Sequence, residues 1–235
     1  MRLFAISDLH LSLGVDKPMH IFGEHWLGHD VRMKQSWDAM VGPEDWILVG
    51  GDTSWGMSIE EAMPDLQWLG ERTGNKVLIR GNHCLWWDRT VAARNKLQAL
   101  VHPSIRLLNL NAFKLPDETV VVGSRLWDPP DAAWAEPGAA KVFARELGFL
   151  KVSIEEGKKL AGRRMVALIH YPPRYSDGRE TAAVPLLKEA GVSLCIYGHL
   201  HGKDIVHGFV GESAGIRYWC ASVDAIDFKP IELPA

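Results

Sequence analysis

The segment Leu3-Phe4-Ala5-Ile6-Ser7-Asp8-Leu9-His10 (residues 3–10) decides the fold. It begins with four apolar residues in a row and ends in a carboxylate and an imidazole. An apolar run of this length without polar alternation is typical of a strand buried on both faces, as in parallel sheets. Asp8 and His10 follow directly, so residues capable of chemistry are expected at the carboxyl end of this strand.

Five further apolar runs follow along the chain, several of them rich in β-branched residues. They lie at residues 46–49, 76–79, 119–122, 165–169 and 193–197. Segments of helical character separate them, at roughly residues 31–41, 58–72, 89–100, 137–160 and 181–190. This alternation of strands and helices predicts an α/β protein with parallel strands.

Two local patterns refine this prediction. Ser58, with Glu61 three residues later, predicts a capping box at the start of a helix. After Gly202 the pattern changes to short alternating segments with glycine turns. Residues 204–210 and 215–221 are therefore predicted to form antiparallel strands that close a second sheet or a sheet edge.

The composition excludes several classes of protein. The 235 residues carry a net charge of −3, which leaves no surplus of Lys or Arg for sequence-independent binding of nucleic acid. No stretch approaches the ~20 apolar residues of a membrane span. No repeat or linker-like run divides the chain, so a single domain over residues 1–235 is expected.

The cysteines and the first residues indicate the compartment. Cys84, Cys195 and Cys220 are few, odd in number and far apart, which argues against a disulfide framework and for a reducing environment. The first residues carry Asp8 and His10 where a signal peptide needs an unbroken apolar segment. A cytoplasmic location is therefore expected.

Five of the six predicted strands run into Asp, Asn or His at their carboxyl ends. In a parallel sheet these ends lie along one edge, where α/β proteins build their sites. Their convergence predicts a polynuclear metal site. The blocks are Asp8-Leu9-His10, Gly50-Gly51-Asp52, Gly81-Asn82-His83, His170 and Gly198-His199-Leu200-His201.

The spacing within two of these blocks supports shared ligation. Residues i and i+2 of an extended chain point to the same side, so Asp8 and His10 can reach one ion together. The same argument applies to His199 and His201. The glycine at position 51 allows the backbone to turn tightly beside the cluster.

The number and kind of donors point to two ions. Asn82 and His83 are neighbours whose side chains must diverge, so one can ligate while the other reaches toward substrate. Seven candidate side chains exceed the four of a closed tetrahedral zinc site, whereas two ions with a bridging carboxylate use that number. Nitrogen and oxygen donors without thiolate suit Mn, Fe, Zn or Co.

The five blocks, in this order over residues 8–201, resemble the calcineurin-like metallophosphoesterases. The resemblance implies an α/β sandwich in which two central mixed β-sheets are flanked by α-helices, in four layers of the order αββα. It also implies a role for each matching residue. Asp8, His10 and His201 would hold one metal ion, Asn82, His170 and His199 the other, Asp52 would bridge the two, and His83 would lie beside the scissile phosphate.

The resemblance further implies a metal-dependent phosphoester hydrolase. Two cations ~3.5–4 Å apart bind phosphoryl oxygens and lower the pKa of a bridging water, which yields a hydroxide nucleophile at neutral pH. His83 would protonate the leaving oxygen or stabilise its charge. The expected substrates are small phosphodiesters or phosphomonoesters, nucleotides among them, with a phosphoprotein as the less favoured alternative. No residue is assigned to substrate binding, and the sequence indicates no oligomeric state.

The residue after the Gly-Asn-His block departs from the family pattern. Cys84 stands where the family usually has an Asp or Glu that orients the histidine, and a thiol is a weak hydrogen-bonding group. The favoured interpretation of Cys84 is a small buried residue. The hypotheses for the acid step are that Asp88 takes over or that substrates with good leaving groups are preferred.

Other aromatic residues follow the site blocks. Trp55, Trp86 and Trp87 are candidates for the wall of the pocket mouth, where one of them would stack on an aromatic group. His25 and His29 are expected to lie on the surface or in a hydrogen-bonded core, with a position over the pocket as the alternative.

Two rival functions follow from the same residues. The first is a non-catalytic interaction module that retains the metallophosphoesterase fold, for which Cys84 is the only support. The second is a different metallohydrolase, such as an amidohydrolase or a metallo-β-lactamase-like enzyme. Those enzymes typically begin with a His-x-His block, whereas here that block comes last.

Overall fold

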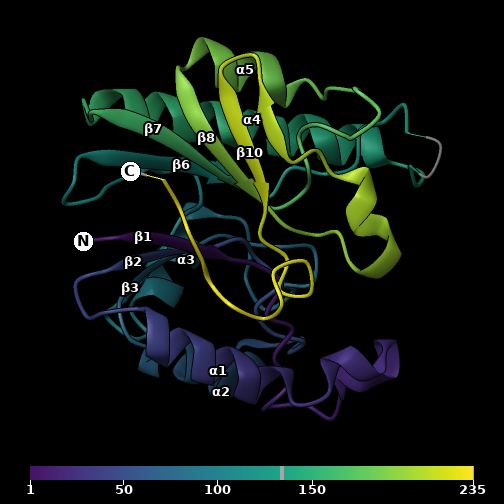
Figure 1. The fold of residues 1–235 in the computed structure, drawn as a ribbon. Helices are drawn as coiled ribbons and strands as arrows, with labels where there is room; N and C mark the ends of the chain where they lie inside the picture. Colours follow the sequence, from purple (N-terminus) through teal and green to yellow (C-terminus); the bar gives the residue numbers. More distant parts are fainter. Residues whose placement is uncertain (133–134, 235) are drawn as a thin grey trace. The chain divides into compact units, whose positions relative to one another are not determined.

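The computed structural model describes residues 1–132 and 135–234, which divide into two compact units (Figure 1). The first unit comprises residues 1–107 with the segment from residue 221 onward, and the second comprises residues 108–220. Each unit is built on one mixed β-sheet with flanking helices. The predicted α/β class with two mixed sheets is confirmed, and the single domain over residues 1–235 stays a prediction.

The sheet of the first unit places three of the predicted strands side by side. The strands β1, β2, β3 and β4 run parallel, and β11 pairs antiparallel with β1. The order across the sheet is β11-β1-β2-β3-β4. The bounds are β1 Leu3–Ile6, β2 Trp46–Val49, β3 Asn75–Leu78, β4 Ile105–Leu107 and β11 Ile231–Glu232.

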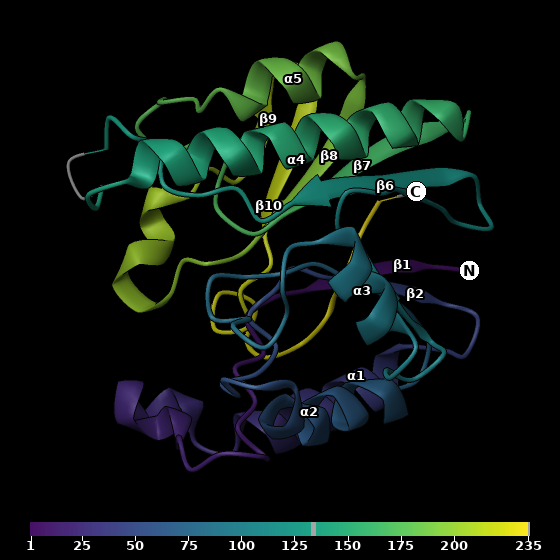
Figure 2. The same ribbon diagram turned by 180° about the vertical axis from the view of Figure 1, so that it is seen from behind.

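Helices α1 (His29–Met40) and α2 (Ile59–Glu71) lie on one face of this sheet, as both ribbon views show (Figures 1 and 2). Met33 and Trp37 of α1 are fully buried and belong to the same core cluster as Phe4. Helix α3 (Val91–Gln98) and the short 3₁₀ helices η1 (Met19–Phe22) and η2 (Glu24–Trp26) complete the unit. The apolar strands therefore acquire the burial that their composition predicts.

The start of α2 has the predicted cap. The Ser58 hydroxyl accepts a hydrogen bond from the Glu61 amide at 3.3 Å. The Glu61 carboxylate in turn accepts one from the Met57 amide at 2.7 Å. The capping box is confirmed, with the reciprocal bond made one residue before the usual position.

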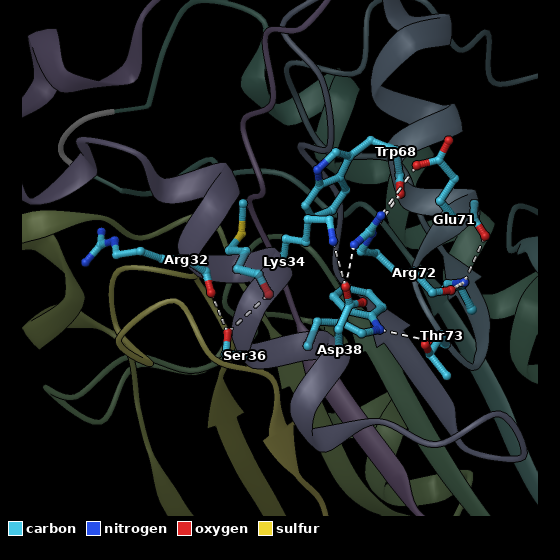
Figure 3. Close-up of polar contacts among 12 residues, drawn as sticks. Arg32, Lys34, Ser36, Asp38, Trp68, Glu71, Arg72 and Thr73 are labelled. Carbon is cyan, nitrogen blue, oxygen red and sulfur yellow. Dashed lines mark hydrogen bonds and ion pairs between the residues drawn. The ribbon is translucent and has the colours of Figure 1, made fainter.

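Polar contacts join α1 to the end of α2 (Figure 3). The Arg72 guanidinium lies 2.8 Å from the Asp38 carboxylate, and the Lys34 ammonium lies 3.1 Å from it. The Trp37 indole donates to the Thr73 carbonyl at 2.9 Å. Because the Arg72 side chain is only 5% exposed, this ion pair is less screened by solvent than a surface pair.

The sheet of the second unit is parallel in its centre and antiparallel at both edges. The strands β6, β7, β8 and β10 run parallel, while β5 pairs antiparallel with β6 and β9 with β10. The order is β5-β6-β7-β8-β10-β9. The bounds are β5 Phe113–Lys114, β6 Thr119–Ser124, β7 Arg164–Ile169, β8 Val192–Tyr197, β9 Gly211–Ser213 and β10 Ile216–Cys220.

Helices α4 (Ala139–Lys159) and α5 (Ala183–Glu189) cover one face of this second sheet (Figure 2). Ser153 of α4 accepts a hydrogen bond from the Gly123 amide at 2.9 Å, which connects the helix to β6. Glu146 of α4 is buried and pairs with Arg125 at 2.8 Å.

In the described residues no helix combines the length and the apolar character that a membrane crossing needs.

The prediction for the last part of the chain is wrong in two respects. Residues 204–210 are not a strand, because Gly202–His207 forms a 3₁₀ helix, η3. Residues 216–220 do form a strand, but β10 is parallel to β8 and antiparallel only to β9. The edge strands β5 and β11 have two residues each, which is too short for a periodic sequence signal.

A buried carboxylate on α2 connects the loops that follow β1 and β2. Asp65 accepts hydrogen bonds from the Leu13 amide, at 2.8 Å, and from the Ser54 hydroxyl. Its side chain has no solvent exposure, and burial raises the pKa of this carboxyl to about 6. The folded state therefore favours the protonated acid more than the unfolded chain does.

This shift predicts a pH dependence of stability. In the unfolded chain Asp65 ionises near its ordinary pKa, so its contribution to folding is present below about pH 4 and is lost as pH rises through about 6. Asp65→Asn keeps an acceptor for Leu13 and a donor for Ser54 but cannot ionise. Between pH 4 and 7 the unfolding free energy of the wild type should fall by roughly 2.5 kcal/mol relative to Asp65→Asn, measured by urea denaturation.

A control of opposite sign is the exposed Asp227, whose pKa is lowered by its hydrogen bond to Lys229. Asp227→Asn should lose stability relative to the wild type as pH rises. A wild-type to Asp65→Asn difference that stays constant from pH 4 to 7 would contradict the assignment to Asp65.

Candidate metal centre

In the first unit the loops that follow β1 and β2 run side by side beyond the strands. The Asp8 amide donates to the Gly51 carbonyl at 3.0 Å, and the His10 amide to the Asp52 carbonyl at 2.9 Å. The Leu11 amide donates in the same way to the Thr53 carbonyl at 2.9 Å. These bonds continue the β1–β2 pairing and hold two site blocks together.

Three site residues in these loops have left-handed backbone conformations. The φ angles are 60° at Asp8, 45° at His10 and 44° at Asp52. A non-glycine residue in this region costs on the order of 1–3 kcal/mol, so the loop hydrogen bonds must offset it. The extended conformation that the sequence predicts for Asp8 and His10 is therefore wrong.

The expected proximity of Asp8 and His10 is nevertheless present. A carboxylate oxygen of Asp8 lies within 4.8 Å of a ring nitrogen of His10, and also within 4.8 Å of a carboxylate oxygen of Asp52. All three side chains are buried, at 0%, 3% and 1% exposure respectively. The left-handed turns, rather than the alternation of a strand, bring these three donors together.

His29 of α1 supports the first of these loops. Its Nε2 lies 3.1 Å from the Leu9 carbonyl and 3.3 Å from the His10 carbonyl. Carbonyl oxygens only accept hydrogen bonds, so Nε2 carries the proton that His29 donates. Burial lowers the pKa of His29, which favours this neutral form. The prediction of a hydrogen-bonded core histidine is confirmed at His29, while His25 is exposed.

The third block of the first unit is attached to Asp52. The His83 amide donates to Asp52 Oδ1 at 2.8 Å. A Cβ on Gly81 would lie 2.0 Å from the same oxygen, and a Cβ on Gly51 would lie 2.7 Å from the Gly81 nitrogen. Both positions need glycine because the loops approach too closely for any side chain.

Cys84 is buried below this loop, as predicted for a small buried residue. Its sulfur accepts a hydrogen bond from the Gly81 amide at 3.2 Å and lies 4.0 Å from Asp52 Oδ1. Burial raises the pKa of the Cys84 thiol to about 11. Asp88, the proposed replacement carboxylate, accepts a hydrogen bond from the Thr90 amide before α3.

Trp55 lies against two of the site blocks. Its ring stacks on the His10 imidazole with a centroid distance of 4.6 Å and lies 4.4 Å from that of His83. The Lys17 ammonium lies 3.1 Å from the Trp55 ring centroid, a cation–π distance. Trp55 therefore fixes the positions of two site histidines. Trp86 and Trp87 were also expected as wall residues but are buried in the hydrophobic core.

Ser222 is a site residue that the sequence reasoning missed. Its hydroxyl donates to Asp8 Oδ2 at 3.0 Å and so orients the carboxylate. The neighbouring backbone is held by a bond from the Ser7 amide to the Ala221 carbonyl, at 2.7 Å. The signal that could have revealed Ser222 is its place just beyond a parallel strand, β10.

The remaining histidines follow two neighbouring strands of the second unit. The Gly198 amide donates to the His170 carbonyl at 3.0 Å, and the rings of His170 and His199 lie 5.2 Å apart. The Tyr171 ring lies 3.8 Å from that of His199, a contact that sequence reasoning also missed. The expectation that all five strand ends lie along one sheet edge is wrong. Three of these strands, β1, β2 and β3, belong to the first sheet, whereas β7 and β8, which precede His170 and His199, belong to the second.

The donors of the first unit fit a metal ion. Asp8 and Asp52 are two buried carboxylates within 4.8 Å of each other, and burying two like charges is costly without a nearby cation. His10 adds an imidazole nitrogen to these oxygens. Such mixed donors suit first-row divalent ions.

The chain matches the family model described as calcineurin-like phosphoesterase over residues 1–203. Two phage proteins match a shorter part: the gene 66 proteins of Mycobacterium phages L5 and D29 are 37% and 42% identical over 79 residues. That match covers 33% of this chain and 37% of each phage protein.

Solved structures show similarity of fold. The protein TT1561 of Thermus thermophilus has a TM-score of 0.55 and 13% identity, with 98% of this chain and 97% of that one covered. A protein of unknown function from Aquifex aeolicus, AQ665, gives 0.53 and 15%, with 98% and 95% covered. The sulfate thiohydrolase SoxB of Thermus thermophilus gives 0.51 and 14%, with 94% of this chain and 51% of SoxB covered.

The family match covers far more than half of the chain, and the donor residues follow strands in the order that the sequence predicts. This protein belongs to the calcineurin-like phosphoesterase family.

The close approach of Gly81 to Asp52 predicts the effect of one methyl group. Gly81→Ala places a Cβ 2.0 Å from Asp52 Oδ1 and 2.6 Å from the Asp52 nitrogen, so the carboxylate must move. We expect a loss of ~2 kcal/mol in unfolding free energy, measured by urea denaturation, and weaker Mn²⁺ binding, measured by equilibrium dialysis.

The control is Gly148→Ala in α4, where an added Cβ meets no atom within 4 Å. That variant should gain ~0.5–1 kcal/mol, because alanine favours a helix over glycine, and should bind Mn²⁺ as the wild type does. Wild-type Mn²⁺ binding in Gly81→Ala would show that the contact does not position Asp52.

Proposed function

We propose that this chain hydrolyses small phosphoesters with two metal ions and a water-derived nucleophile. The observation that carries the proposal is the buried set of Asp8, His10 and Asp52 at the ends of β1 and β2, in a chain of the calcineurin-like phosphoesterase family. The proposed ligands are Asp8, His10 and His201 for one ion, Asn82, His170 and His199 for the other, and Asp52 as the bridge.

Ions at these ligands would polarise the phosphoryl group and make a water acidic enough to attack at neutral pH. The chain's own residues prepare the ligands for this task. Ser222 holds one oxygen of Asp8, and the His83 amide holds one oxygen of Asp52. Such hydrogen bonds fix the orientation of the metal ligands. Metal affinity therefore depends on these supporting groups as well as on the ligands themselves.

His83 is the proposed general acid for the leaving oxygen. Its backbone is fixed by the bond to Asp52, and its ring is held against Trp55. The side chain is partly exposed, whereas Asp52 is buried, so His83 can reach a substrate that approaches from solvent. An imidazole in this position can supply a proton near neutral pH.

For the substrate and the metal ions we propose chemical classes rather than single compounds. Small phosphodiesters and phosphomonoesters, nucleotides among them, are the proposed substrates, and the ions are divalent or trivalent Mn, Fe, Zn or Co. The net charge of −3 disfavours nucleic acid as a partner. Three free, buried cysteines support the proposal of a cytoplasmic location.

The test is a hydrolysis screen of chelator-stripped protein with Mn, Fe, Zn, Co and Mg added back singly and in pairs. It compares bis(4-nitrophenyl) phosphate with 4-nitrophenyl phosphate. We expect metal-dependent hydrolysis that falls about 100-fold or more in kcat/KM in Asp52→Asn, because both ions lose their shared ligand.

Asp227→Asn is the matched control, because it makes the same chemical change at an exposed residue with a left-handed φ of 53°, which asparagine tolerates. It should retain wild-type activity. Metal-independent hydrolysis, or wild-type activity in Asp52→Asn, would overturn the mechanism. Less than one ion per chain without hydrolysis of either ester would favour the non-catalytic module.

A further inference from the structure

The second unit contains a cavity of 640 Å³ that reaches the site histidines. Its volume lies in the range of small-molecule sites. His199 and His201 line the cavity together with residues of the segment 175–179 and of η3. The lining includes the charged or polar residues Asp128, Tyr175, Asp177, Arg179, Asp204 and His207.

Backbone hydrogen bonds give the cavity a defined wall. The Tyr175 amide donates to the Arg179 carbonyl at 2.9 Å, and the Ser176 amide to the His207 carbonyl at 2.9 Å. The Asp204 amide donates to the His201 carbonyl at 2.9 Å. The two segments that face the cavity are thus attached to each other and to a proposed metal ligand.

The charge of this wall is negative. The Arg179 guanidinium lies 2.7 Å from the Asp177 carboxylate, so its charge is offset within the wall. Asp128 and Asp204 add two more carboxylates, and the His207 ring lies 3.9 Å from Asp204. The wall therefore carries more negative than positive charge.

Tyr175 lines the cavity together with these carboxylates. Burial raises the pKa of Tyr175; the negative charges of Asp128, Asp177 and Asp131 raise it further, while the Arg179 guanidinium lowers it. Those charges act on Tyr175 only because they lie near it. The Arg179 guanidinium also lies near, 5.1 Å from the Tyr175 ring centroid, so one positive charge accompanies three carboxylates around this residue.

We propose that this cavity binds the alcohol portion of the phosphoester and selects an alcohol with an ammonium group over one with a further anionic group. This inference rests on the proposed function, because His199 and His201, which line the cavity, are proposed metal ligands. The phosphate would lie toward these histidines and the ammonium group toward Asp128 and Asp204.

The same charge distribution disfavours polyanionic substrates. A second phosphate or a carboxylate on the alcohol would face the wall carboxylates at short range, where like charges repel each other. Amino-alcohol phosphoesters are therefore better substrates for this pocket than nucleoside di- or triphosphates. Because part of this wall is exposed to solvent, the preference should weaken as ionic strength rises.

The test uses three phosphomonoesters of matched chain length as inhibitors of bis(4-nitrophenyl) phosphate hydrolysis by the metal-loaded protein. They are 2-aminoethyl phosphate, 2-hydroxyethyl phosphate and 2-carboxyethyl phosphate. The same three compounds are titrated by calorimetry. We expect 2-aminoethyl phosphate to bind about tenfold or more tightly than 2-carboxyethyl phosphate at low salt.

The variants Asp204→Asn and Asp128→Asn, singly and together, should reduce this ratio, to about threefold or less in the double variant. Glu155→Gln is the control, since this exposed carboxylate on α4 lies outside the cavity, and it should keep the wild-type ratio. A wild-type ratio near one, or a high ratio that survives the double substitution, overturns the inference while leaving the proposed function intact. Absence of hydrolysis with any metal overturns the proposed function, and the calorimetric ratio still decides the charge selection.

Discussion

The parallel pairing of β1 with β2 continues beyond both strands, and the metal-site geometry of the first unit depends on this continuation. The amides of Asp8 and His10 bond to the carbonyls of Gly51 and Asp52 after the strands have ended. These bonds stabilise left-handed turns at three non-glycine residues. The turns direct two carboxylates and an imidazole to one place. Without them, Asp8 and His10 would lie on the same side of an extended strand, as the sequence predicts.

A second layer of contacts keeps these turns in place. Ser222 binds Asp8, His29 donates to the carbonyls of Leu9 and His10, and Asp65 accepts bonds from both loops. These residues come from the C-terminal segment, α1 and α2. Helices α1 and α2 therefore do more than cover a sheet: each also provides a group that fixes a loop of the site.

Much of the fold could be predicted from the sequence, because the buried strands are continuous apolar runs. The runs at residues 3–6 and 46–49 coincide with β1 and β2, and the other four predicted strands agree to within two residues at each end. The division into two sheets follows from long-range pairing, which leaves no local signal. The 3₁₀ helix η3 was mistaken for a strand because its adjacent β-branched residues Ile205 and Val206 are typical of strands.

The site was predictable in its residue types but not in its supporting contacts. Asp8, His10 and Asp52 stand out because each follows an apolar run. Ser222 and Tyr171 do not, because a lone serine or tyrosine after a strand is common and their roles come from tertiary contacts. The negative wall of the cavity is likewise assembled from residues up to about 80 positions apart in the sequence.

The central claim is that the site holds two ions that share Asp52. The most direct test is the Mn²⁺ content of chelator-stripped protein after equilibrium dialysis, measured by mass spectrometry for the wild type and Asp52→Asn. We expect two tightly held ions per chain in the wild type and one or none in the variant. Fewer than two ions in the wild type, or an unchanged content in Asp52→Asn, would contradict the claim.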